Sequence, residues 1–250
     1  MADILVVGSL NTDLVVRAPR FPVPGETIHG EDLAILPGGK GANQAVAASR
    51  QGASTAMLGR VGRDNFGEFL LDNLKNDNVD ARLVRRDEAA TGTAMIIIDE
   101  VGQNSIILSP GANGQVTAAD VDPAALSGPK LVLFQLEIPL ETTLHAARLA
   151  RQKDVRVLLN PAPARELPDE LIELADYVLP NEIELHMLTG QRVQDVPSAE
   201  SAARALLAKG ARTVIVTLGA KGAMLVAKNE SKHIPAFNVN VVDTTAAGDA

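Results

Sequence analysis

The chain has 250 residues, of which 46% are hydrophobic and 22% charged, and its formal net charge is −8. The acidic balance, the 2% of aromatic residues and the absence of Trp argue against nucleic-acid binding. The sequence has no Cys, which excludes disulfides and thiol catalysis and is compatible with the cytoplasm, where we expect the protein to act. No apolar run approaches the roughly 18 residues of a membrane span, so no membrane association is expected.

Short apolar runs, each followed by a polar or glycine-bearing corner, recur along the chain. The first, ILVVGSL at 4–10, predicts a strand rather than a signal peptide because no basic residue precedes it. Further runs begin at residues 131, 155, 177 and 213, and helical patterns lie at 140–152, 168–175, 182–189 and 199–209. Continuous apolar strands that alternate with helices indicate an α/β fold with a mainly parallel sheet covered on both faces.

Two stretches, 14–37 and 91–109, have no helix that could cover them. The first carries prolines between alternating segments, and the second predicts a β-hairpin that turns near 100–103. We expect them to form a small antiparallel lid inserted into an α/β domain made of 1–13, 38–90 and 110–250. One face of this lid could close over a ligand, and the other could meet a partner.

The stretch PGGKGANQAVAASRQG at 37–52 looks like a phosphate loop but lacks the Walker spacing. Ala34 stands where that loop needs a glycine, and Gly41 stands where it needs Ser or Thr. We expect a helix over 41–52, with Lys40 and Asn43 on its first turn. These side chains could bind a polyhydroxy ligand or a phosphate, or the stretch could be an ordinary helix start with a flexible glycine entry.

Polar side chains follow the predicted strands, at the edge where parallel sheets bind ligands. Asn11 and Asp13 could form a fork for adjacent hydroxyls, or an Asx turn. Asn181 and Glu184 could cap a helix, or help to hold Mg²⁺ from its outer coordination sphere.

Two small-residue segments could approach phosphate oxygens through their backbone amides. TLGAKG at 217–222 could wrap phosphates or simply connect two strands. In DTTAAGD at 243–249, the small residues could form an anion-binding nest. Asp249 could then act as general base for an alcohol that attacks phosphorus, or it could be a helix-capping aspartate.

Six motifs, in this order, resemble the PfkB-type carbohydrate kinase family, and within it the kinases that act on ribose. They are NTD at 11–13, GGKGANQAVA at 38–47, LNPAPARELPDEL at 159–171, PNEIE at 180–184, TLGAKG at 217–222 and DTTAAGD at 243–249. The resemblance covers essentially the whole chain. It implies a three-layer α/β/α sandwich with a mainly parallel central sheet and a small antiparallel β lid.

The resemblance also implies ATP-dependent phosphorylation of D-ribose at O5, which gives ribose 5-phosphate. The alternatives are a kinase for another sugar or a nucleoside, or a non-catalytic sugar- or nucleotide-binding dimer. The implied partners are ribose, ATP and a second copy of the chain, which would join through the lid. The implied cofactors are Mg²⁺ with ATP, and K⁺ as an activating monovalent cation.

The family's functional residues carry over by motif. The implied sugar-binding residues are Asn11, Asp13, Gly39, Lys40, Asn43 and Glu137. The implied nucleotide-binding residues are Asn181, Thr217, Gly219, Ala220, Lys221 and Gly222. The implied catalytic residues are Ala246, Ala247 and Gly248 as anion hole and Asp249 as base. The implied metal-site residues are Glu184 for Mg²⁺, indirectly, and Asp243 and Thr245 for the monovalent cation.

One departure from the family concerns the end of the sequence, which stops one residue after Asp249. The family continues with further helices and with residues around the adenine. We therefore expect those C-terminal helices to be absent here, and a chain that binds sugar better than it phosphorylates it.

Overall fold

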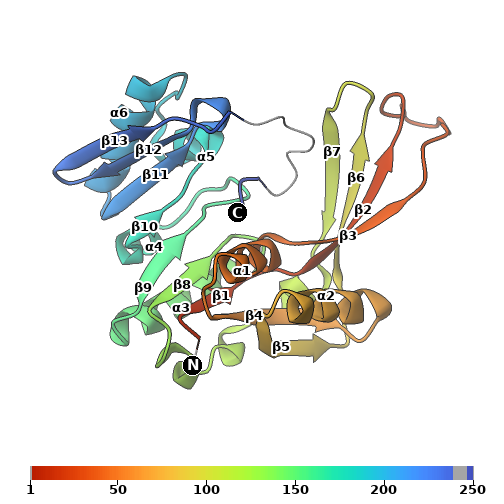
Figure 1. Cartoon of the computed structure of the whole chain (residues 1–250), viewed down its shortest axis with the longest axis horizontal. Helices are drawn as coiled ribbons and strands as arrows, with labels where there is room; N and C mark the ends of the chain where they lie inside the picture. The colour runs from red at the N-terminus through yellow and green to blue at the C-terminus, as the bar shows by residue number, and fades with distance from the viewer. Residues whose placement is uncertain (1, 239–246, 250) are drawn as a thin grey trace.

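The structure is a computed structural model that describes residues 2–238 and 247–249 (Figure 1). Its main body is a nine-stranded sheet in the order β13-β12-β11-β10-β9-β8-β1-β4-β5. The strands are β1 (Ile4–Val7), β4 (Thr55–Gly62), β5 (Asp80–Asp87), β8 (Leu131–Phe134), β9 (Arg156–Leu159), β10 (Tyr177–Val178), β11 (Thr213–Thr217), β12 (Ala223–Ala227) and β13 (Glu230–Ile234). The pairs from β5 across to β11 are parallel, and β12 and β13 add an antiparallel edge. The mainly parallel sheet is thus confirmed.

Helices connect the parallel strands, as the alternating pattern predicted. The α-helices are α1 (Lys40–Arg50), α2 (Asn65–Asn76), α3 (Leu140–Gln152), α4 (Asp169–Leu174), α5 (Glu182–Thr189) and α6 (Val196–Ala208). Four short 3-10 helices are η1 (Gly111–Gln115), η2 (Ala118–Asp120), η3 (Pro123–Leu126) and η4 (Gly219–Lys221). Within the described part of the chain, no helix is long and apolar enough to cross a membrane.

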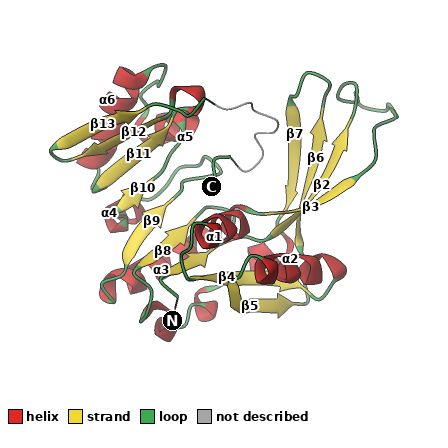
Figure 2. Ribbon diagram, viewed as in Figure 1, coloured by secondary structure: helices red, strands yellow, loops and turns green. Residues whose placement is uncertain are grey.

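The side chains of β1 alternate between two hydrophobic clusters, because successive residues of a strand point to opposite faces. Val6 packs in the cluster that contains Ala42 of α1 and Leu70 of α2. Leu5 and Val7 pack in the larger cluster, which includes buried residues of α3, α4, α5 and α6. Figure 2 shows α1 and α2 in front of the strands that they cover. The sheet therefore has helices on both faces, as expected for a three-layer sandwich.

The first turn of α1 packs directly on the chain that leaves β1. Gly39, the N-cap of α1, has φ 88° and ψ 128°, a conformation that side chains with a Cβ rarely adopt. A Cβ at Gly39 would lie 2.5 Å from the backbone nitrogen of Asn11, and a Cβ at Gly41 would lie 2.7 Å from that of Ser9. The glycines of the 37–52 stretch thus permit close contact between two backbones.

A second, four-stranded sheet stands off the main body (Figure 1). This small sheet contains β3 (Ala34–Gly38), β2 (Asn11–Arg17), β6 (Gly92–Ile98) and β7 (Asn104–Ser109), in that order. The pairs β2–β3 and β6–β7 are antiparallel, as predicted, but the central pair β2–β6 is parallel. The reason lies in the main sheet: β2 continues from β1 and β6 from β5. Both strands therefore start at the same edge and run the same way.

The small sheet begins earlier than the sequence predicted. Asn11 and Asp13 lie in β2, where Asn11 pairs with Gly38 and Asp13 with Leu36 of β3. The prediction that they end the first strand was wrong, because β1 stops at Val7 and the chain turns before Asn11. Their spacing of two still directs both side chains to one face.

The close approach at Gly39 can be tested with two matched substitutions. Gly39→Ala combines backbone strain with a collision against fixed backbone, so we expect the free energy of unfolding to fall by at least about 3 kcal/mol. Gly52 has φ 90° but open space around it. Gly52→Ala should therefore suffer strain alone, about 1–2 kcal/mol. Urea unfolding of both variants measures the difference, and equal losses would contradict the packing of α1 on β2.

Candidate active site

Two adjoining cavities lie beneath the small sheet. The first, of about 390 Å³, is lined by Asn11, Asp13, Gly39, Lys40, Asn43, Ala94, Ile96, Ile106, Leu108, Glu137, Pro163 and Asp249. The second, of about 280 Å³, is lined by Lys40, Ile96, Ile98, Asn104, Ile106, Asn160, Ala162, Leu179, Asn181, Glu184, Thr217, Gly248 and Asp249. Lys40 and Asp249 line both cavities. All six residues predicted to bind sugar therefore come together in the first cavity, although they are spread over positions 11 to 137.

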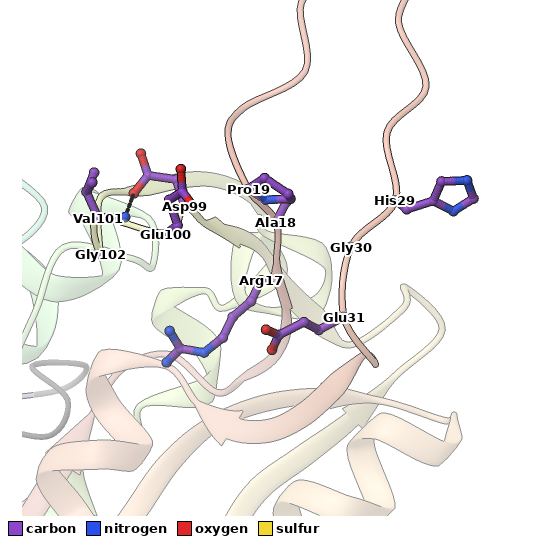
Figure 3. Close-up of a pocket in the computed structure, with 10 residues that line it drawn as sticks. All are labelled: Arg17, Ala18, Pro19, His29, Gly30, Glu31, Asp99, Glu100, Val101 and Gly102. Carbon is purple, nitrogen blue, oxygen red and sulfur yellow. Dashed lines mark hydrogen bonds between the residues drawn. The ribbon is translucent and has the colours of Figure 1, made fainter.

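A larger hollow, of about 770 Å³, lies elsewhere, at the far end of the small sheet (Figure 3). It is lined by Arg17 at the end of β2 and by the loops that follow β2 and β6, including Glu31 and Glu100, and His29 points away from the other labelled side chains. None of the predicted site residues lines it. We assign the site to the two smaller cavities because they gather buried carboxylates, a lysine and several amides at the carboxyl ends of the parallel strands.

Asp13 is the most perturbed group of the first cavity. Burial, together with the nearby charges of Glu137 and Asp249, raises its pKa from 3.8 to about 6, against the opposing effect of Lys40. No hydrogen bond to this carboxylate comes from a residue within the described ranges. Its oxygens are therefore available to accept hydrogen bonds from a ligand.

Glu137 is fixed by three donors that all reach the same carboxylate oxygen. Its Oε2 accepts hydrogen bonds from Ser9 Oγ at 2.6 Å, from the backbone N–H of Lys40 at 3.2 Å and from Asn11 Nδ2 at 3.3 Å. Ser9 in turn accepts a hydrogen bond from the backbone N–H of Gly41 at 3.3 Å. The close packing of α1 on the chain that leaves β1 therefore orients Glu137, and within the described residues no donor is bound to its Oε1.

Asp249 is held by the first turn of α1. Asn43 Nδ2 donates to its Oδ2 at 2.9 Å, and Lys40 Nζ lies 3.6 Å from its Oδ1. The Asp249 side chain is only 10% exposed. Two residues predicted to bind sugar thus contact the predicted base, at the boundary between the two cavities.

Asn181 and Glu184 form a reciprocal cap at the start of α5, in the second cavity. Asn181 Oδ1 accepts from the backbone N–H of Glu184 at 2.8 Å, and Glu184 Oε2 accepts from that of Asn181 at 2.8 Å. Asn181 Nδ2 also donates to Glu184 Oε1 at 3.0 Å. The capping alternative is therefore present, and burial raises the pKa of Glu184. Thr217 lies beside Asn181 through a parallel backbone bridge.

The rest of the 217–222 loop does not join this cavity. Gly219, Ala220 and Lys221 form η4, and none of them lines the cavity, nor does Gly222. Lys221 Nζ donates to the backbone oxygen of Gln194 at 2.7 Å, on an exposed surface.

The C-terminal motif is described only in part. Ala247, Gly248 and Asp249 form a turn, in which Ala247 is exposed and Gly248 lines the second cavity. Asp243, Thr245 and Ala246 lie outside the described residues. Within 2–238 and 247–249, no group of three or more His, Cys, Asp or Glu side chains could hold a metal ion.

Sequence reasoning missed two polar residues that organise the first cavity. Ser9 sits in the corner after β1, and a hydroxyl at the carboxyl end of a buried strand was the signal that could have found it. Asn113, in η1, hydrogen-bonds to Leu10 and Asn11, which lie more than 100 positions away in the sequence. No local spacing marks such a contact.

Residues 1–250 match the family described as pfkB family carbohydrate kinase. The chain is 40% identical to a ribokinase of Staphylococcus aureus (strain COL), across 98% of this chain and 82% of that protein. It is also 40% identical to a deoxyribokinase of Salmonella typhi, across 99% of this chain and 82% of that protein. A solved ribokinase of Arabidopsis thaliana, complexed with ribose and ATP, has a TM-score of 0.91 and 33% identity, across 99% of this chain and 82% of that one.

The raised pKa of Asp13 predicts that the site destabilises the free protein. Because the folded pKa lies above the unfolded value, the folded state is disfavoured when Asp13 is charged, and this penalty fades as pH falls through about 6. Asp13→Asn should therefore raise the free energy of unfolding by up to about 3 kcal/mol at about pH 7.5, and by much less at about pH 4.

Urea unfolding at both pH values measures this effect. Asp80→Asn is the matched control, because the hydrogen bond and charge of Arg82 lower the pKa of Asp80, so its loss should not stabilise the protein at neutral pH. If the Asp13→Asn variant is less stable than the unsubstituted protein at about pH 7.5, the charged Asp13 carboxylate does not destabilise the folded state, and this explanation is wrong.

Proposed function

Because the chain belongs to the pfkB family of carbohydrate kinases, we propose that it transfers the γ-phosphoryl group of ATP to O5 of D-ribose, giving ribose 5-phosphate and ADP. The observation that carries this proposal is the position of Asp249. Its carboxylate stands between a cavity rich in groups for binding hydroxyls and a second cavity at the start of α5, and Lys40 accompanies it in both.

The first cavity supplies the mixture of donors and acceptors that a sugar needs. Asp13 and Glu137 offer carboxylate oxygens, while Asn11, Asn43 and Lys40 offer N–H donors. The backbone at Gly39 has no Cβ, so a sugar can approach it closely. A polyol that fills this cavity would pair several hydroxyls at once, and a buried charge-assisted hydrogen bond contributes roughly 1.5–3 kcal/mol each.

The second cavity is proposed to hold the phosphates of ATP. Asn181 and Thr217 line it, and we assign the amides of the 217–222 loop to the nucleotide on the strength of the family motif. Glu184, whose pKa is raised by burial, offers carboxylate oxygens of the kind that Mg²⁺ prefers, directly or through water. Mg²⁺ bound with ATP would neutralise charge on the phosphate oxygens. Asp243 and Thr245 are proposed for K⁺ by motif.

The proposed chemical step needs one base. Asp249 accepts the proton of the O5 hydroxyl as O5 forms its bond to the γ-phosphorus and the bond to the β,γ-bridging oxygen breaks. The electron pair of that bond leaves with ADP. Lys40 Nζ, 3.6 Å from Asp249 Oδ1, helps to position this carboxylate, and the backbone N–H groups at 246–248 are proposed to stabilise the charge on the transferred phosphoryl group.

The substrate itself has a specific competitor. The deoxyribokinase relative is as similar in sequence as the ribokinase relative, so 2-deoxyribose is the second candidate. A coupled assay of ADP release with ribose, 2-deoxyribose, other pentoses and nucleosides decides between them, and phosphorus NMR of the product locates the ester at O5. Sugar binding without ADP release for any substrate would instead indicate a non-catalytic binding protein.

We further propose that the small sheet acts as a lid and joins two copies of the chain. Its face towards the cavities carries Ile96, Ile106 and Leu108. On the other face, one row crosses all four strands through Ile35, Leu14, Met95 and Ile107. Five of the large apolar side chains on these strands are between 45% and 68% exposed, namely Ile35, Met95, Ile106, Ile107 and Leu108. Such apolar surface favours burial against a partner.

The cytoplasm is proposed as the location because the reaction consumes ATP.

Asp249→Asn tests the proposed base. It keeps the shape of the side chain but cannot accept the proton, so we expect kcat for ribose phosphorylation to fall by about a hundred- to ten-thousandfold. The KM for ribose should change far less. Asp72→Asn, on the exposed face of α2, is the control and should leave kcat unchanged. If Asp249→Asn retained most of its kcat, another group would have to be the base.

Ile106→Glu and Ile107→Glu test the dimer, because these neighbours point to opposite faces of the small sheet. A sheet that buries one face against its partner tolerates a charge only on the other. We therefore expect the unsubstituted chain to sediment as a dimer, one variant to sediment as a monomer, and the other to remain a dimer. An unsubstituted chain that is monomeric at high concentration, or a dimer unaffected by either change, would contradict this arrangement.

A further inference from the structure

Asn113 lies just behind the first cavity and lines neither of the two cavities. It is only 1% exposed and sits in η1, directly after the small sheet rejoins the main body. Among the described residues, its side chain hydrogen-bonds to Leu10 and Asn11, at the start of β2. It therefore connects the end of the small sheet to the strand that carries Asn11 and Asp13.

The backbone of Leu10 fixes which way the Asn113 amide faces. The N–H of Leu10 donates to Asn113 Oδ1 at 2.9 Å, and Asn113 Nδ2 donates to the carbonyl oxygen of Leu10 at 2.9 Å. Backbone groups cannot exchange donor and acceptor roles. The amide group of Asn113 therefore has one satisfactory orientation, with its nitrogen towards β2.

The second N–H of Asn113 transmits this orientation to Asn11. Asn113 Nδ2 donates to Asn11 Oδ1 at 2.7 Å, so that oxygen is required as an acceptor. Asn11 Nδ2 is then directed to Glu137 Oε2, at 3.3 Å. A flipped Asn11 amide would set two NH₂ groups against each other and its oxygen against a carboxylate, and both contacts are repulsive.

The pair is also enclosed by backbone. A Cβ at Gly92, the first residue of β6, would lie 2.2 Å from Asn113 Nδ2 and 2.4 Å from Asn11 Oδ1. The two amides therefore touch the backbone of β6 directly, with no room for a side chain between them. Gly92 also pairs with Asn11 in the β2–β6 ladder.

From these contacts we infer that Asn113 is a positioning residue: it fixes the Asn11 amide so that an N–H donor, not a carbonyl oxygen, faces the sugar cavity. This inference rests on the proposed function for the identity of the ligand. The consequence is that different residues of the cavity supply the hydrogen-bond donors and the acceptors. Asp13 and Glu137 act as acceptors, and Asn11 donates to a hydroxyl oxygen.

Asn113→Asp is the test, because it preserves shape and keeps the acceptor for the Leu10 N–H. It replaces the NH₂ group with an oxygen that faces two acceptors. The Asn11 amide then turns its NH₂ towards the new carboxylate and its oxygen towards the cavity. We expect the KM for ribose to rise roughly tenfold, as for the loss of one hydrogen bond, while kcat and the KM for ATP change by less than about twofold.

Thr12→Val is the matched control. Thr12 is a fully buried neighbour in β2, and among the described residues its hydroxyl has no hydrogen-bond partner. This variant probes a buried polar change in the same strand without touching the amide pair. It should leave the KM for ribose unchanged.

A double-mutant cycle separates positioning from simple structural support. If Asn113 acts through Asn11, Asn113→Asp should raise the ribose KM in the unsubstituted chain but not in an Asn11→Ala background. The same rise in both backgrounds overturns the inference. If the unsubstituted protein phosphorylates neither ribose nor another sugar, the proposed function is refuted but the role of Asn113 is not. Neutron diffraction of the unsubstituted protein then shows which way the Asn11 amide faces.

The same diffraction experiment applies if Asn113→Asp does not fold. Deuterons of the Asn11 amide that face Glu137 support the inference. Deuterons that face Asn113 overturn it.

Discussion

The candidate site depends on one close contact, the packing of the first turn of α1 on the chain that leaves β1. Because Gly39 and Gly41 lack a Cβ, the backbone of this turn reaches that of Ser9 and Asn11. The contact brings the Lys40 N–H and the Ser9 hydroxyl to one oxygen of Glu137. From the same turn, Asn43 and Lys40 reach Asp249. Three segments distant in sequence are therefore positioned by the start of a single helix.

The site also concentrates negative charge. Asp13, Glu137 and Asp249 line one cavity with Lys40, and burial together with these like charges raises the pKa of Asp13. An isolated domain would be more stable with apolar or amide groups at such positions. The free protein keeps this unfavourable arrangement, and a ligand that donates several hydrogen bonds would relieve it. Stability and binding therefore make opposite demands on the same side chains.

The sequence predicted those parts of the fold that follow from local pattern. Apolar runs separated by helical patterns indicated the parallel sheet, and a parallel sheet implies a site at the carboxyl ends of its strands. The motif at 38–47 identified α1 and its entry, and the motif at 180–184 identified the cap of α5.

The remaining features depend on long-range pairing, which local pattern does not encode. The parallel β2–β6 pair arises because β1 and β5 end at the same edge of the main sheet, a fact of topology rather than of either segment. Ser9 and Asn113 contact partners that are more than 100 residues away. Asn11 could be recognised as a candidate ligand, but its place in the small sheet could not, because β1 ends inside the run ILVVGSL at 4–10, which reads as a single strand.

The membership of Asn11 and Asp13 in β2 has a mechanical consequence. In many hinged enzymes the flap moves over a site that stays still, but here two of the groups that face the cavity, Asn11 and Asp13, belong to the small sheet itself. Any tilt of the small sheet would carry these side chains relative to Glu137 and Lys40, which belong to the main body. The orientation of the small sheet and the affinity for sugar would then be thermodynamically linked. A bound sugar would stabilise one orientation of the sheet. A partner that stabilised the same orientation would increase the affinity for sugar by the same free energy.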